Sequence, residues 1–145
     1  MIDQQDQSRD FTFVLVENAR ILVMDDDPIQ CEFARVYLST PTATVETAEN
    51  GAEGLRMLKA EKFDLAVIDL DMPVMNGFQV IRAVRSDPVL RALPIVVVTG
   101  REDVESIDRA YDEGATSFAT KPVNWRLLSY QLRYVLRAQK MAATA

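Results

Sequence analysis

The chain has 145 residues, enough for one domain with a buried core, and its 48% hydrophobic and 26% charged residues are ordinary for a globular protein. It has no histidine, which excludes a histidine zinc site, a Ser-His-Asp triad and a histidine general base within the chain. The formal charge of −6 argues against direct nucleic-acid binding. No run approaches the ~20 apolar residues of a membrane span, and the single Cys31 excludes an internal disulfide, so we expect a cytoplasmic protein without a membrane segment.

The chain begins with an extension, residues 1–18, whose pattern differs from that of residues 19–140. Residues 1 to about 10 are polar and without periodicity, which predicts disorder. Residues 11–16 are apolar, so we expect them to pack on the domain or across a dimer. Residues 19–140 alternate strand and helix signals five times and predict one domain, with residues 141–145 as a tail.

Three short apolar runs each end on a polar side chain, and a fourth short segment, 117–120, ends on Lys121. Runs of this length, bounded by turn residues, predict buried strands of a parallel sheet. The runs and the residues that end them are 21–24 with Asp25 and Asp26, 65–68 with Asp69, 95–98 with Thr99, and 117–120 with Lys121. A shorter β-branched segment at 44–47 is the fifth predicted strand.

Helix signals lie between the runs. Asp27, Asn50 and Asn76 have the side chains of N-caps, and Gly114 is typical of a helix C-terminus. The predicted helices are about 27–39, 51–61, 77–86, 103–113 and 125–140. In the first helix we expect the apolar side chains at helical spacing to face the core, namely Ile29, Phe33, Val36 and Tyr37.

Strands that alternate with helices form βαβ units with right-handed crossovers. Five such units predict an α/β, flavodoxin-like, doubly wound (βα)5 fold whose five-stranded parallel sheet has the strand order 2-1-3-4-5. The switch point of that topology lies beside the first strand, which is directly succeeded by the acidic pair Asp25 and Asp26.

The same topology brings the polar strand ends to one edge of the sheet. Asp25, Asp26 and Asp69 would repel one another there, and a hard divalent cation such as Mg²⁺ removes that cost. The cation also neutralises phosphoryl oxygens, and a carboxylate can form an aspartyl-phosphate. Lys121 supplies a second positive group and Thr99 a hydroxyl donor, so the set predicts phosphoryl transfer to Asp69.

From residue 19 to residue 137 the chain resembles the receiver domains of bacterial two-component response regulators. The motifs that carry the resemblance are the Asp25-Asp26 pair, the segment 69–77 from Asp69 to Gly77, Thr99-Gly100 and Lys121-Pro122. It implies that Asp69 accepts a phosphoryl group from the phosphohistidine of a histidine kinase or phosphotransfer protein. It also implies that Asp26, Asp69 and the backbone carbonyl of Asp71 bind Mg²⁺, that Asp25 reaches it through water, and that Thr99 and Lys121 contact the phosphoryl group.

The resemblance implies a switch as well. Thr99 turns toward the phosphoryl group, the aromatic Phe118 moves after it, and the surface of the fourth helix, fifth strand and fifth helix changes, a surface through which receivers commonly form homodimers. A cis Lys121-Pro122 peptide is also implied. Asp71 and Arg101 depart from the commonest pattern, and we hypothesise that they pair across the site mouth, restrict the attacking water and slow dephosphorylation.

Two other interpretations fit the sequence less well. The segment 66–71 fits the Asp-x-Asp entry of haloacid-dehalogenase-like phosphatases, although in those enzymes the acidic Mg²⁺ pair comes after the lysine rather than before the first motif. A degenerate receiver that only docks partners is the third interpretation. The 145 residues leave no room for an effector domain after the receiver, so we expect either a stand-alone regulator or a fragment. Residues 124–138 also resemble receivers that precede a diguanylate cyclase effector domain.

Overall fold

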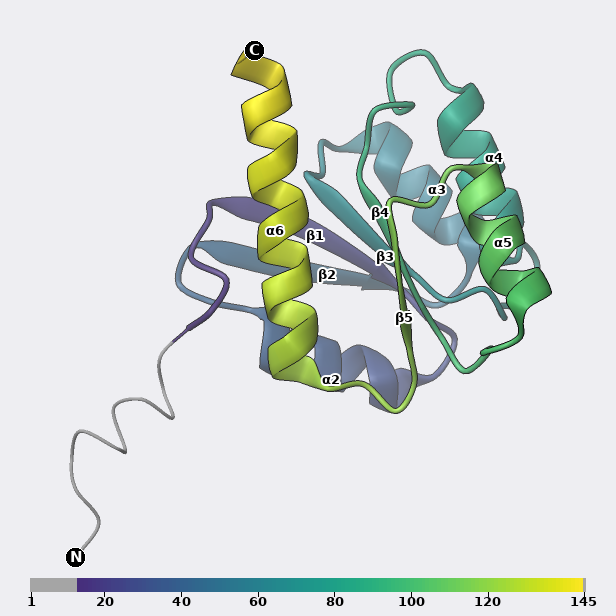
Figure 1. The fold of residues 1–145 in the computed structure, drawn as a ribbon, viewed down its shortest axis with the longest axis horizontal. Helices are drawn as coiled ribbons and strands as arrows, with labels where there is room; N and C mark the ends of the chain where they lie inside the picture. The colour runs from purple at the N-terminus through teal and green to yellow at the C-terminus, as the bar shows by residue number, and fades with distance from the viewer. Residues whose placement is uncertain (1–12, 145) are drawn as a thin grey trace, which may run out of the picture.

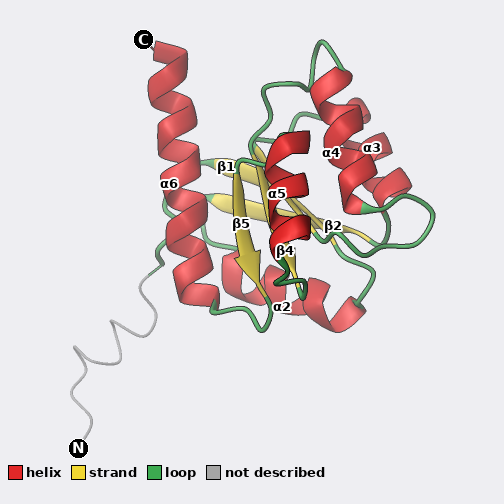
Figure 2. Ribbon diagram, turned by 45° about the vertical axis from the view of Figure 1, so that its right-hand side comes forward, coloured by secondary structure: helices red, strands yellow, loops and turns green. Residues whose placement is uncertain are grey.

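The computed structural model describes residues 13–144, and the expected disorder of residues 1 to about 10 lies outside them. Five strands form one parallel sheet in the order β2-β1-β3-β4-β5. They are β1 (Ala19–Met24), β2 (Ala43–Ala48), β3 (Leu65–Ile68), β4 (Ile95–Thr99) and β5 (Ser117–Thr120). The helices between and after them are α2 (Pro28–Leu38), α3 (Gly51–Ala60), α4 (Gly77–Ser86), α5 (Val104–Glu113) and α6 (Trp125–Thr144). The predicted fold class and strand order are confirmed (Figures 1 and 2).

The sheet is buried on both faces, with α3, α4 and α5 on one side and α2 and α6 on the other (Figure 1). Successive side chains of β1 alternate between the two layers, as a period of two requires: Leu22 and Met24 join the first, Ile21 and Val23 the second. Burial on both faces explains why the central strands β1, β3 and β4 are nearly continuous apolar runs in the sequence, whereas the partly exposed edge strands β2 and β5 contain more polar residues.

The helix starts agree with the capping signals of the sequence. The side chain of Asp27 accepts a hydrogen bond from the backbone N–H of Ile29, and Asn76 and Gln79 form a reciprocal capping box. Gly114 ends α5 in the left-handed conformation, with φ 118°. The caps hold the helix starts of α2 and α4 directly behind the strand ends that carry the polar residues.

The prediction for α2 was wrong about which face is buried. Cys31, Ala34 and Leu38 face the sheet, whereas the apolar residues expected in the core point to solvent. Those exposed residues are Ile29, Phe33, Val36 and Tyr37. Helical periodicity identifies a stripe but not its direction, and the small buried side chains gave the weaker hydrophobic signal.

Residues 13–18, here called the strap, precede β1. The first three of them lie beside residues of α2 and α6. Leu15 is 1% exposed and belongs to the layer that packs α2 and α6 on the sheet. The hydroxyl of Thr42 donates to the carbonyl of Val16 at 2.8 Å. Glu17 accepts from Arg133 and Arg137 of α6 at 3.1 and 3.2 Å. The strap is therefore fixed to the domain by two buried apolar side chains, Val14 and Leu15, and by several polar contacts.

At its other end the domain finishes in a longer helix than expected. α6 continues to Thr144, past the expected end near residue 140, because Met141, Ala142 and Ala143 favour helix and no glycine or proline interrupts them. Within residues 13–144 no helix combines the length and apolar character needed to cross a membrane.

We predict that Leu15→Ala lowers the free energy of unfolding by about 2–4 kcal/mol, because it leaves a cavity between the sheet and its two covering helices. Phe13→Ala, at a side chain that is 50% exposed, serves as the control and should change stability much less. Urea unfolding monitored by circular dichroism measures both. Equal, small losses would show that the strap contributes nothing to the core.

Candidate functional site

The polar residues that end β1 and β3 gather at one edge of the sheet. One carboxylate oxygen each from Asp25, Asp26 and Asp69 lies within 4.8 Å of the others. Asp25 and Asp69 are buried at 4% and 6% exposure, whereas Asp26 is exposed. The structure thus brings together three carboxylates that sequence reasoning placed at a common edge.

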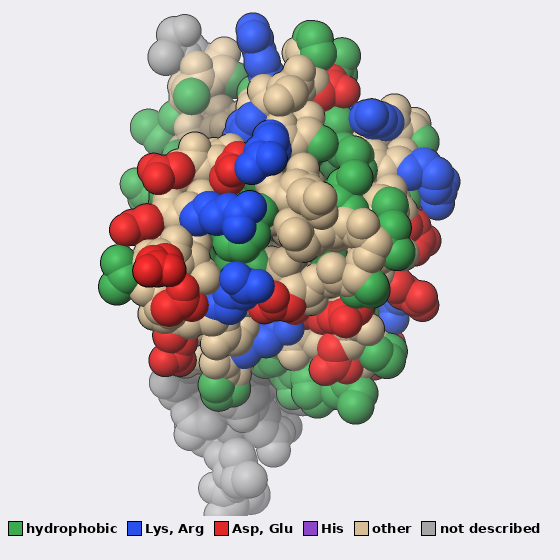
Figure 3. All heavy atoms as spheres, turned by 90° about the vertical axis from the view of Figure 1, so that its right-hand side faces the viewer, with side chains coloured by type: hydrophobic (Ala, Val, Ile, Leu, Met, Phe, Trp, Pro, Cys, Tyr) green, Lys and Arg blue, Asp and Glu red, His purple; other side chains and the backbone are tan. Residues whose placement is uncertain are grey.

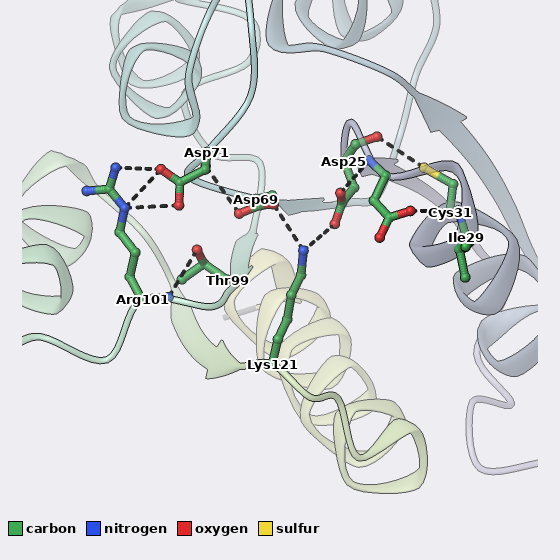
Figure 4. A network of polar contacts seen from close by, with 9 residues as sticks. Asp25, Ile29, Cys31, Asp69, Asp71, Thr99, Arg101 and Lys121 are labelled. Carbon is green, nitrogen blue, oxygen red and sulfur yellow. Dashed lines mark hydrogen bonds and ion pairs between the residues drawn. The ribbon is translucent and has the colours of Figure 1, made fainter.

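Lys121 lies between two of these carboxylates (Figure 4). Its ammonium donates to Asp25 Oδ2 at 2.8 Å and to Asp69 Oδ2 at 3.0 Å. Burial works against the charged form, but the bonds to Asp25 and Asp69 outweigh it and raise the pKa of Lys121. The two hydrogen bonds therefore favour the charged form of the lysine between Asp25 and Asp69.

Backbone amides orient the same carboxylates. The N–H of Asp27 donates to Asp25 Oδ1 at 2.9 Å, and the N–H of Asp71 donates to Asp69 Oδ1 at 3.2 Å. Burial raises the pKa of Asp25, although Lys121 opposes the shift. Cys31, a neighbour that sequence reasoning did not connect with the site, donates its thiol to the Asp25 carbonyl at 3.2 Å, and burial raises its pKa to about 11.

Thr99 ends β4 beside this group and is fully buried. Its backbone carbonyl accepts from the N–H of Lys121 at 2.8 Å, which joins the ends of β4 and β5. Phe118 of β5 is partly buried, and its ring lies 6.5 Å from that of Tyr111 on α5. The Lys121-Pro122 peptide is cis, as the resemblance implied.

Asp71 and Arg101 do pair at the mouth of the site (Figure 4). Arg101 Nε lies 3.0 Å from both carboxylate oxygens, and Nη2 lies 2.5 Å from Oδ1. The guanidinium also donates to the hydroxyl of Ser106 at 3.3 Å, and thereby reaches α5. The hydrogen bonds between Arg101 and Asp71 have two effects: they lower the pKa of Asp71 and raise the pKa of Arg101.

Gly77 allows the start of α4 to lie close to the backbone of Asp69. The sequence indicated this residue only as part of a motif and as the start of a helix. A Cβ there would lie 2.4 Å from the carbonyl oxygen of Asp69 and 2.7 Å from Leu70 Cα. Its N–H donates to the Leu70 carbonyl at 3.0 Å. The start of α4 therefore packs directly against the backbone that carries Asp69.

The donor set fits a hard divalent cation. It is made only of carboxylate oxygens, it is concentrated within a few ångströms, and the exposed Asp26 leaves one side open to water. Mg²⁺ prefers oxygen ligands and keeps several of its waters, so the site suits it better than a thiol- or imidazole-seeking metal.

The fold and site define a doubly wound α/β domain with an acidic group at the topological switch point. The family model described as the response regulator receiver domain matches residues 21–133. The chain is therefore a member of the response regulator receiver family, a family of signalling domains in two-component systems whose general function is to accept a phosphoryl group.

Curated relatives agree with this membership. The chain is 37% identical over 106 residues to the transcriptional regulatory protein GlrR of Escherichia coli (strain K12), covering 73% of this chain and 23% of that protein. It is 31% identical over 116 residues to the heme response regulator HssR of Staphylococcus aureus (strain JH9), covering 80% and 50%. The chain thus spans half or less of the length of these relatives.

Solved structures agree on the fold. A CheY-like response regulator receiver domain from Methanospirillum hungatei JF-1 superposes with a TM-score of 0.80 at 28% identity, covering 86% of this chain and 98% of that one. The chemotaxis response regulator CheY4 of Vibrio cholerae superposes with a TM-score of 0.76 at 32% identity, covering 81% and 98%.

We predict that Gly77→Ala destabilises the domain by about 2 kcal/mol or more, because its methyl group would overlap the backbone of Asp69. Gly100→Ala is the matched control, since nothing lies within 4 Å of a Cβ at that position of the site loop. Thermal unfolding of both variants measures the difference. Equal melting temperatures would contradict the close approach.

Proposed function

We propose that the chain accepts a phosphoryl group on Asp69 from the phosphohistidine of a histidine kinase or phosphotransfer protein, in a Mg²⁺-dependent reaction. The observation that carries the proposal is the position of Lys121, whose ammonium bonds both Asp25 and Asp69. A buried carboxylate with one oxygen on a cation and the other on a backbone N–H is held in a fixed orientation for attack.

In the transfer, an oxygen of Asp69 forms a bond to phosphorus while the P–N bond to the donor imidazole breaks, and the imidazole keeps the electron pair. Lys121 neutralises charge on the phosphoryl oxygens, and the Thr99 hydroxyl donates to one of them. Asp26, Asp69 and the backbone carbonyl of Asp71 would hold Mg²⁺, with Asp25 acting through water. When bound, the ion would supply charge neutralisation for the phosphoryl oxygens.

The output surface in this proposal comprises α5, β5 and α6, the predicted fourth helix, fifth strand and fifth helix. Thr99 and Phe118 would change position on phosphorylation, and Phe118 already contacts Tyr111 of α5. Figure 3 views the domain from the side on which α5 lies, and acidic and basic side chains are interspersed there. Such a surface can pair with a second copy by opposite charges, which supports a homodimer rather than a nucleic-acid contact.

The other interpretations have less support. The family match and the order of the acidic motifs both disfavour a haloacid-dehalogenase-like phosphatase. A receiver that only docks would not need the site residues, all of which are present. We propose a cytoplasmic signalling domain that assists its own phosphorylation and dephosphorylation, and that controls a partner or a C-terminal effector domain, for example of the diguanylate cyclase type.

We predict that incubation with acetyl phosphate and Mg²⁺ adds one phosphoryl group to the native chain, because Asp69 lies beside the charge-neutralising groups. Intact-mass spectrometry measures the gain. Asp69→Asn with Mg²⁺, and the native chain with EDTA, should show none. An equal gain in Asp69→Asn would place the acceptor elsewhere, and no gain in a magnesium-binding native chain would favour the docking interpretation.

We predict that Arg101→Ala shortens the lifetime of the aspartyl-phosphate several-fold, because loss of the Asp71 partner opens the site mouth to water. Decay of the phosphorylated mass after removal of the donor gives the lifetime. Arg109→Ala, which removes a guanidinium that stacks on Phe78 without bonding Asp71, is the control. An unchanged lifetime in Arg101→Ala would refute this role for the pair.

A further inference from the structure

The outer face of α2 exposes four large apolar side chains. Ile29 and Val36 are each 63% exposed, Tyr37 is 54% exposed and Phe33 is 45% exposed. They lie on one side of a single helix, opposite the residues that contact the sheet. Contiguous apolar surface of this kind is costly in water and marks a surface that something covers.

The first residue of α6 extends this surface. The Trp125 ring stacks on Tyr37 at 5.6 Å with an interplanar angle of 15°, and it meets Phe33 edge-on at 6.5 Å. Phe33 and Tyr37 are themselves 6.2 Å apart. We call Ile29, Phe33, Val36, Tyr37 and Trp125 the aromatic face. Its rings brace one another, so the face is preformed.

A groove of about 230 Å³ runs along one side of the aromatic face. Val36, Tyr37 and Trp125 of the aromatic face line it together with Phe13 of the strap. Phe13 is half exposed, whereas Leu15 two residues later is buried in the core. The described chain therefore begins at this groove, with Phe13 in its lining.

We propose that residues 1–12 fold back over the aromatic face and cover it within the same molecule. Their apolar side chains, Met1, Ile2 and Phe11, supply the contacts. Twelve residues can reach up to ~40 Å, whereas α2, with 11 residues, is ~16 Å long, so the segment can span the face. The tether keeps the segment at a high local concentration, and a weak apolar contact is then enough.

Charge favours this occupant. Residues 1–12 contain three aspartates and one arginine, so the segment is acidic. Arg126 lines the groove, and it has no carboxylate partner within residues 13–144; its guanidinium lies 5.9 Å from the Tyr130 ring. An acidic segment that enters the groove from Phe13 passes this guanidinium. The proposal does not rest on phosphoryl acceptance by Asp69.

The chain offers its own reporter, because Trp125 is its single tryptophan and belongs to the aromatic face. The test compares iodide quenching of tryptophan emission in the native chain, a chain that lacks residues 1–12, and full-length Ile2→Ser/Phe11→Ser. Gln4→Ser/Gln5→Ser is the control with two polar changes. We expect about twofold stronger quenching and a red shift in the truncated chain and the Ile2/Phe11 variant, with the control like the native chain.

The same quenching in the native and truncated chains would overturn the proposal. If the truncated chain does not fold, as judged by circular dichroism, the full-length Ile2/Phe11 variant decides alone. Shielding that increases with protein concentration, together with a dimer in light scattering, would instead assign the cover to a second copy and would also overturn it. Each variant is also labelled with acetyl phosphate. Because all of them keep Asp69, a loss of labelling would count against the phosphoryl-acceptor proposal and not against the cover of the aromatic face.

Discussion

The arrangement of the site depends on one electrostatic constraint: two buried carboxylates share a single ammonium. Asp25 and Asp69 come from neighbouring strands, and Lys121 reaches both from the end of the outermost strand. Breaking a buried ion pair by removing one partner leaves an uncompensated charge and is strongly destabilising. Two carboxylates and one ammonium leave one negative charge in excess, so loss of the ammonium would destabilise this edge of the sheet, and a bound divalent cation or a phosphoryl group would change the charge of the site.

The surrounding structure holds these groups in place with backbone contacts. The amides of Asp27 and Asp71 orient the two carboxylates, and Gly77 lets α4 approach the backbone of Asp69 without a side chain between them. Arg101 joins the mouth of the site to α5 through Asp71 and Ser106. A change of charge at Asp69 is thus three contacts away from the helix at the proposed output surface: Asp69 to Asp71, Asp71 to Arg101, and Arg101 to Ser106 of α5.

Much of this could be predicted from the sequence, because buried parallel strands are continuous apolar runs and their polar ends must meet at one edge. The pairing of Asp71 with Arg101 could also be predicted, since both stand two residues beyond site residues on neighbouring strands. The buried side of α2 could not, because Ile29 and Phe33 form a stronger apolar stripe than Cys31 and Ala34. The contacts of Gly77 and Cys31 with the site could not be predicted either, because they depend on distances in the folded structure that the number of residues between two positions does not determine.

The most direct test of the shared-ammonium account is the effect of Mg²⁺ on the thermal stability of Lys121→Met and of the native chain. The account predicts that Lys121→Met lowers the melting temperature in EDTA, and that Mg²⁺ stabilises this variant more than the native chain, because the ion then compensates carboxylates that have lost their ammonium. An unchanged melting temperature in EDTA, or an equal Mg²⁺ effect in both proteins, would contradict the claim that Lys121 offsets negative charge shared by Asp25 and Asp69.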